Sequence, residues 1–240
     1  MDESPILKDV IRMEIIYHGH SCVQLIADGK SLLIDPFLRG NQIAKTQQED
    51  IKSDCILLTH AHTDHILDAE PIARANDAPI VAIFELANYL SWKQLKTIEI
   101  NMGGTVDLGF ARAKMIQAFH SSGIMLEEGK IIYGGMPGGY IVQMGGLTIL
   151  HAGDTALFSD MRMIGERHAI DVAFIPIGAN YTMGPDDALQ AAAWYGAKLV
   201  IPIHYDSFPA IRQDAEAFVR RLEAQQQRGK AMAPGDRCVL

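Results

Sequence analysis

The sequence has little of several features that mark other classes of protein. Only three of its 240 residues are cysteine, and Cys22 and Cys55 fall within apolar runs where a thiol packs as a small apolar group. No apolar run approaches the ~18 residues that a membrane span needs. The acidic start, Met1 to Pro5, is followed by no basic and apolar segment of the signal-peptide kind. These absences predict a cytoplasmic protein with no membrane span.

Positive charge is also scarce. The formal net charge is -8, so no positive field gathers a polyanion, and we expect a small-molecule substrate and no nucleic-acid partner. Apolar residues make up 48% of the chain and charged residues 21%, which excludes disorder as the main state.

The order of strand-like and helix-like segments predicts a layered fold. Two series of strands, at 13–18, 21–27, 31–35 and 55–59 and then at 112–118, 130–133, 140–144 and 147–151, are each followed by alternating helices and strands. The first alternation has helices at 67–76 and 84–94 around a strand at 79–83, and the second has helices at 156–166, 185–195 and 210–227 with strands at 171–175 and 199–203. Two such halves predict two sheets packed face to face with helices outside. We expect a single domain over residues 1–240, with a loose tail from about residue 228.

Four metal-ligand side chains stand within six residues, directly after the apolar run 55–58. They are His60, His62, Asp64 and His65, in the segment THAHTDH. Imidazole and carboxylate ligands without thiolate suit an open site for zinc or another first-row divalent ion. A solvated polar turn is the plain alternative, which three histidines and an aspartate at this spacing disfavour.

Further ligand-type residues follow other strand-like runs. His120, Asp154 and His204 each come just after one. A His or Asp at a strand end is more often a turn residue than a ligand. Three of them, in a fold whose strand ends form one rim, favour a shared site.

This order of motifs, beginning with Asp35, resembles that of the metallo-β-lactamase superfamily, whose fold is a four-layer αββα sandwich. Segments such as GHS at 19–21 and HAGDT at 151–155 are similar to a bacterial and archaeal family of uncharacterised metal-dependent hydrolases, related to ascorbate-phosphate lactonase. The resemblance covers about residues 13–206 and leaves the substrate open. It also makes a homo-oligomer plausible.

The resemblance implies two divalent metal ions, zinc first, with manganese, nickel or iron as alternatives. By position, one ion would be bound by His60, His62 and His120, the other by Asp64, His65 and His204, and Asp154 would bridge them. A metal-bridging hydroxide would then attack an ester-type bond in a phosphodiester, lactone or related small molecule. Asp35 would accept a hydrogen bond from a metal-bound histidine.

The proton donor to the leaving group is less constrained. Besides Asp64, the candidate catalytic residues are His20 and Tyr181, with His18 and Asp206 behind them. His20 could equally be a histidine packed in a tight turn.

Three other functions remain open. A di-metal redox enzyme of the same fold typically has Glu where His62 stands. A nuclease is disfavoured by the acidic balance. A noncatalytic metal-binding module would be expected to lose a ligand, and the sequence keeps them all.

Overall fold

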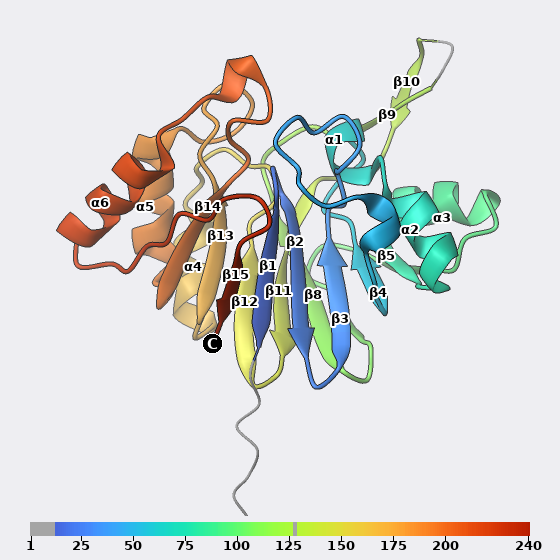
Figure 1. Ribbon diagram of the computed structural model, residues 1–240, viewed down its shortest axis with the longest axis horizontal. Coiled ribbons are helices and arrows are strands. Elements are labelled where there is room, and N and C mark those ends of the chain that lie inside the picture. Colours follow the sequence, from blue (N-terminus) through green and yellow to red (C-terminus); the bar gives the residue numbers. More distant parts are fainter. Residues whose placement is uncertain (1–12, 127–128) are drawn as a thin grey trace, which may run out of the picture.

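Two large β-sheets lie face to face in the computed structural model, which describes residues 13–126 and 129–240 (Figure 1). Helices α2 and α3 lie beside one sheet, and α4, α5 and α6 beside the other. This is the four-layer arrangement that the sequence predicts.

The first sheet has seven strands in the order β15-β1-β2-β3-β4-β5-β6. Strands β3 to β6 are parallel to one another, and the apolar residues of β3, β4 and β5 are buried because helices cover the outer face. The strands are β1 (Glu14–Gly19), β2 (Cys22–Ala27), β3 (Lys30–Ile34), β4 (Cys55–Leu57), β5 (Ile80–Ile83), β6 (Thr97–Ile100) and β15 (Arg237–Val239).

The second sheet has six strands in the order β14-β13-β12-β11-β8-β7, and a separate two-stranded ribbon joins β10 and β9. Strands β12, β13 and β14 are parallel. The bounds are β7 (Thr105–Asp107), β8 (Ala111–Gln117), β9 (Gly123–Met125), β10 (Ile131–Tyr133), β11 (Gly138–Met144), β12 (Leu147–His151), β13 (Val172–Pro176) and β14 (Leu199–Ile203).

The helices begin and end close to the predicted positions. In α5, Pro185 occupies the first turn, where its missing N–H costs nothing, and Gly196 ends the helix at a φ of 61°. The helices are α1 (Thr63–Ile66), α2 (Ala69–Asn76), α3 (Phe84–Trp92), α4 (Asp160–Arg167), α5 (Pro185–Tyr195) and α6 (Ala215–Ala224), with short 3-10 turns η1 (Gln48–Asp50) and η2 (Pro209–Ile211).

The main hydrophobic core is shared by both sheets. Fully buried side chains such as Tyr17, Leu33 and Ile56 from the first sheet and Tyr140 and Phe174 from the second belong to one cluster. A second cluster lies between the second sheet and helices α4 to α6. The rigid core fixes the strand ends, and hence the loops that carry the candidate ligands.

The expectation of a loose tail from about residue 228 is wrong. β15 pairs with β1 in antiparallel register, with Cys238 opposite Ile15, and both Cys238 and Met232 are buried. The tail is ordered because the open edge of β1 supplies hydrogen-bond partners that no local sequence signal reveals.

No helix in the described residues combines the length and the apolar character needed to cross a membrane.

Candidate metal centre

Loops from both sheets deliver the candidate ligands to one edge of the sandwich. The segment after β4 carries His60 and His62 and leads into α1, whose first turn carries Asp64 and His65. The second sheet contributes three side chains that each follow the end of a strand, namely His120 after β8, Asp154 after β12 and His204 after β14.

The carboxylate of Asp154 lies at the centre of the cluster. Its Oδ2 atom is 2.9 Å from Nε2 of His204 and 3.3 Å from Nε2 of His65. The same oxygen is 3.6 Å from Nε2 of His120 and 4.0 Å from Nε2 of His60. One carboxylate therefore faces imidazoles from both groups of predicted ligands.

The first group consists of His60, His62 and His120, whose ligand atoms all lie within 4.8 Å of one another. Nε2 of His60 and Nδ1 of His62 are 2.9 Å apart. These nitrogens point at a common space, as three ligands of one ion would.

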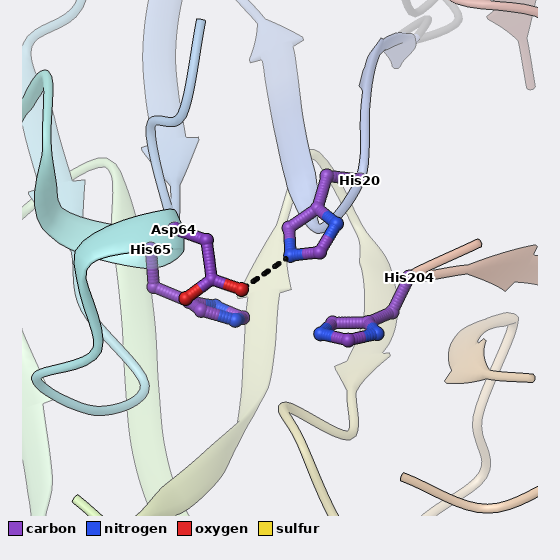
Figure 2. Close-up of side chains that lie close together, drawn as sticks. All are labelled: His20, Asp64, His65 and His204. Carbon is purple, nitrogen blue, oxygen red and sulfur yellow. Dashed lines mark hydrogen bonds and ion pairs between the residues drawn. The ribbon is translucent and has the colours of Figure 1, made fainter. Parts of the chain in front are cut away.

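The second group holds four residues, one more than the sequence predicts. His20, Asp64, His65 and His204 place ligand atoms within 4.8 Å of one another. Figure 2 shows the His20 ring directed at the Asp64 carboxylate, with Nε2 3.1 Å from Oδ2. His204 faces the same space from the opposite sheet.

Asp35 anchors the turn at residues 59–65, which carries four of the candidate ligands. Its carboxylate accepts hydrogen bonds from the backbone N–H of Thr59 at 2.8 Å and from the Thr59 hydroxyl at 2.6 Å. It also lies 2.8 Å from Nδ1 of His65. Because the Thr59 hydroxyl is 3.0 Å from Nδ1 of His60, one buried carboxylate orients a ligand of each group.

Glycines let the two sheets approach closely beneath the cluster. Gly138 donates its N–H to the carbonyl of Thr59 at 3.0 Å, which ties β11 to the turn at residues 59–65. A Cβ on Gly153, whose φ is +64°, would lie 2.3 Å from the carbonyl of Gly138. Only glycine fits this position, and it sets the backbone directly before Asp154.

The electrostatics keep the first group neutral. Burial, followed by the charge of His65, holds the pKa of His60 well below its usual value. Burial also lowers the pKa values of His62 and His120. Neutral imidazoles have free lone pairs near neutral pH, which is what binding a cation requires.

Nearby carboxylates strongly affect the pKa values in the second group. Burial opposes the charged form of His65, but Asp154 and Asp35 outweigh it and raise its pKa well above the usual value. Burial likewise opposes ionisation of Asp154, yet the charges of His204 and His65 hold its pKa well below the usual value. Carboxylates that stabilise a positive charge on His65 so strongly also favour a divalent cation at the same place.

The buried polar atoms also fit metal ions. Among the described residues, Nε2 of His65 and Oδ1 of Asp154 are buried side-chain atoms without a hydrogen-bond partner. Such atoms are costly unless they bind something. Because the set contains only imidazole and carboxylate donors, it suits zinc and similar divalent ions.

A cavity of about 730 Å³ opens above the cluster. Side chains of both groups and of the surrounding loops line it, namely Phe37, His62, Thr63, Asp64, His120, Ser121, Asp154, Tyr181, His204 and Phe208. The candidate ligands are therefore accessible to a small molecule.

The candidate proton donors lie in different places. Tyr181 lines the cavity and is 58% exposed. His20 is fully buried. Its Nδ1 lies 2.6 Å from the hydroxyl of Ser207, and its Nε2 is hydrogen-bonded to Asp64. Burial and the charge of His204 lower the pKa of His20 to about 4, so its ring is neutral near neutral pH.

The two reserve candidates, His18 and Asp206, are not among the residues that line the cavity. His18 uses both ring nitrogens on Thr46 and Gln24, at 3.1 and 3.0 Å. The exposed carboxylate of Asp206 accepts a hydrogen bond from the backbone of Gln213.

Sequence reasoning missed several residues of the site. Phe37 and Phe208 line the cavity, and Ser207 holds His20. Their closeness to Asp35 and His204 in the sequence is the one signal that could have found them. Nothing in the sequence indicates which way their side chains point.

Comparison with known proteins gives consistent results. The sequence pattern of the beta-lactamase superfamily domain matches residues 14–204. A UPF0173 metal-dependent hydrolase of Geobacillus thermodenitrificans is 54% identical over 228 residues, which cover 95% of this chain and 100% of that protein.

Solved structures resemble the whole chain. Igni18, a metallo hydrolase of the archaeon Ignicoccus hospitalis, is 34% identical with a TM-score of 0.86, covering 95% of this chain and 98% of that one. CmlA, a diiron β-hydroxylase of Streptomyces venezuelae, is 17% identical with a TM-score of 0.70, covering 96% of this chain and 54% of that one. At 17% identity, the likeness to CmlA shows a shared fold alone.

Proposed function

The chain belongs to the UPF0173 family of metal-dependent hydrolases, within the beta-lactamase superfamily, and on this premise we propose that it cleaves an ester-type bond of a small molecule with two divalent metal ions. The observation that carries the proposal is the position of Asp154, whose Oδ2 atom faces histidines of both ligand groups. A metal-dependent hydrolase with this donor set has what it needs to hold two ions side by side.

Each residue of the cluster has a place in this proposal. One ion would be held by His60, His62 and His120, the other by Asp64, His65 and His204, with Asp154 between them. The bound ions would supply an activated water near neutral pH and a Lewis acid for the oxygen of the scissile bond. Zinc is our first choice, with manganese, nickel and iron as alternatives.

The sequence makes His20 a candidate proton donor, whereas in this proposal it positions Asp64. Its ring is neutral, and the N–H of Nε2 can donate to the Asp64 carboxylate when Nδ1 accepts from the Ser207 hydroxyl. It is also absent from the residues that line the cavity. Tyr181, at the exposed edge of the cavity, is the better candidate to protonate a leaving group.

The competing functions have less support. His62 stands in the cavity with its ring beside His60, which disfavours the diiron redox arrangement in which a glutamate replaces it. A nuclease would need cations along the substrate path, and no lysine or arginine is among the residues that line the cavity in the described part of the chain. The three free, buried cysteines support a reducing, cytoplasmic location.

The test is turnover of a small panel by metal-free protein that is restored in turn with zinc, manganese and nickel. The panel comprises bis-nitrophenyl phosphate, a nitrophenyl ester, a lactone and a β-lactam. We expect cleavage of one ester-type substrate to appear only when metal is restored, with two ions bound per chain. Turnover that does not depend on metal, or cleavage of the β-lactam alone, would contradict the proposal.

A further inference from the structure

The cavity above the ligand cluster has two unlike sides. Phe37 and Phe208 form an aromatic wall, with ring centroids 5.9 Å apart. The centroids of both rings also lie close to that of His20, at 5.5 and 5.6 Å, in edge-to-face arrangements. Across the cavity, the Ser121 hydroxyl lies 3.4 Å from Nε2 of His62. The apolar side therefore lies next to the second ligand group and the polar side next to the first.

The aromatic wall is held firmly in place. Phe37 is only 4% exposed and lies two residues after Asp35, in the segment that follows β3. Asp35 is itself hydrogen-bonded to Thr59 and His65. Phe208 follows Ser207, whose hydroxyl is 2.6 Å from His20. The wall is a preformed surface, so a group that binds there need not order it first.

Within residues 13–126 and 129–240, the residues that line this cavity include neither lysine nor arginine. The nearby loop carries Arg39, but Nε of Arg39 binds the buried carboxylate of Asp68 at 2.6 Å. Lys45, the other cation of that loop, lies beside Gly235 near the C-terminal segment.

The charge of the cavity and its apolar wall indicate which chemical groups a substrate can carry. The positive charge of metal ions would act at the scissile bond, whereas a charged group elsewhere on the substrate would lose water without gaining a partner. An apolar group against the wall would instead gain from burial, by about 0.8 kcal/mol for each methylene, which corresponds to about fourfold in affinity.

From this asymmetry we infer that the substrate carries an uncharged apolar substituent, aliphatic or aromatic, that binds against Phe37 and Phe208 beside the scissile bond. This inference rests on the proposed function, because the scissile bond must lie over the ligand cluster. It makes Phe37 and Phe208 the specificity-determining residues of the hydrolase. Substrates with a phosphate or carboxylate on that substituent are then disfavoured.

Calorimetry of three hydroxamates with the zinc-loaded protein tests the inference without turnover. Acetohydroxamate supplies the metal-binding group alone, and hexanohydroxamate adds an apolar chain. Adipic acid monohydroxamate has the same chain length with a carboxylate in place of the terminal methyl. We expect hexanohydroxamate to bind at least about tenfold more tightly than acetohydroxamate, and the adipic compound to bind no more tightly than acetohydroxamate.

Substitutions at Phe208 locate the effect. The Phe208→Ala protein should lose most of the preference for the hexano chain while keeping its zinc and its affinity for acetohydroxamate. Phe208→Lys should reverse the preference in favour of the adipic compound, because it supplies the missing cation. Phe84→Ala is the matched control, since Phe84 is 49% exposed on α3 and does not line the cavity.

The outcomes separate the inference from the function on which it rests. Equal binding of the three hydroxamates, or tightest binding of the adipic compound by the unsubstituted protein, would overturn the inference and leave the metal centre intact. If none of the three bound to the zinc-loaded protein, the proposed metal-dependent chemistry at this cavity would itself be wrong.

Discussion

The carboxylate of Asp35 lies 2.8 Å from Nδ1 of His65, and both side chains are fully buried. The bond leaves Nε2 of His65 facing Asp154 at 3.3 Å. A buried carboxylate that holds one ring nitrogen fixes the tautomer and direction of the other, and it makes the imidazole a stronger ligand. The sequence predicted this role for Asp35, and the hydrogen bond is present.

Replacing Asp35 by asparagine should therefore weaken metal binding. Both carboxylate oxygens of Asp35 accept hydrogen bonds. The asparagine amide lacks the negative charge and has an NH₂ donor in place of one of these oxygens, so at least one of the bonds is lost. We expect metal affinity to fall by about 10–100-fold, measured by competition with a chromogenic chelator. The matched control is Asp54→Asn, because Asp54 also accepts from a backbone N–H and a side chain but lies near the surface. Equal affinities in the two variants would refute the role.

Removing a central ligand should have a larger effect. Because Asp154 faces both groups, Asp154→Ala should lose bound metal and reduce turnover on the order of 10³-fold or more, and His62→Ala should behave similarly. Circular dichroism should show the fold largely intact. His168→Ala, at the end of α4 and away from the cavity, is the control. Unchanged metal content and turnover in Asp154→Ala would sink the assignment of the centre.

The clustering of the candidate ligands could be predicted from the sequence because their signals are local. His60, His62, Asp64 and His65 fall within one turn, and the other predicted ligands each follow an apolar run that reads as a buried strand. Strand ends at one edge of a sandwich bring such residues together whatever the details of packing. The layered fold could be predicted for the same reason, from runs of strands followed by alternation.

Other elements depend on tertiary partners. β6 and β7 are short and partly exposed, and β15 is a three-residue strand that forms because β1 offers a free edge. The direction of a side chain is likewise a tertiary property. It decides that His20 turns toward Asp64 and that Phe37 lines the cavity, and periodicity carries no information about either.

A His20→Asn variant should distinguish positioning of Asp64 from proton donation. If His20 positions Asp64, the variant should bind the second ion at least about tenfold more weakly, so that about one ion per chain remains after mild chelation. His18→Asn is the matched control, because His18 is also buried and bonded at both nitrogens, but to Thr46 and Gln24 and not to a candidate ligand. Full metal content, combined with a loss of turnover that grows with the pKa of the leaving group, would instead identify His20 as the proton donor.

The pH dependence of folding stability should report on His151, which lies beneath the cluster. The N–H of its Nε2 can donate to the carbonyl of Ser21 at 2.9 Å, and Nδ1 accepts from the N–H of Gly153 at 3.2 Å. The bond at Nδ1 needs the neutral ring, because a protonated Nδ1 cannot accept, and burial lowers the pKa of His151 below its usual value. Between the folded-state pKa and about 6.5, the unfolded chain therefore binds a proton that the folded chain does not.

The sign of the effect follows from this difference. The contribution of His151 is fully present above pH ~6.5 and is lost as the pH falls toward the folded-state pKa. His151→Gln should therefore lower the free energy of unfolding by about 1–3 kcal/mol at pH 7.5, and by progressively less between pH 6.5 and 5. Urea denaturation in the presence of a chelator measures this difference without interference from metal binding, and His168→Gln, partly exposed, serves as the comparison. A difference for His151→Gln that stays constant on acidification would mean that folding does not lower the pKa of His151, and one that grows would mean that folding raises it.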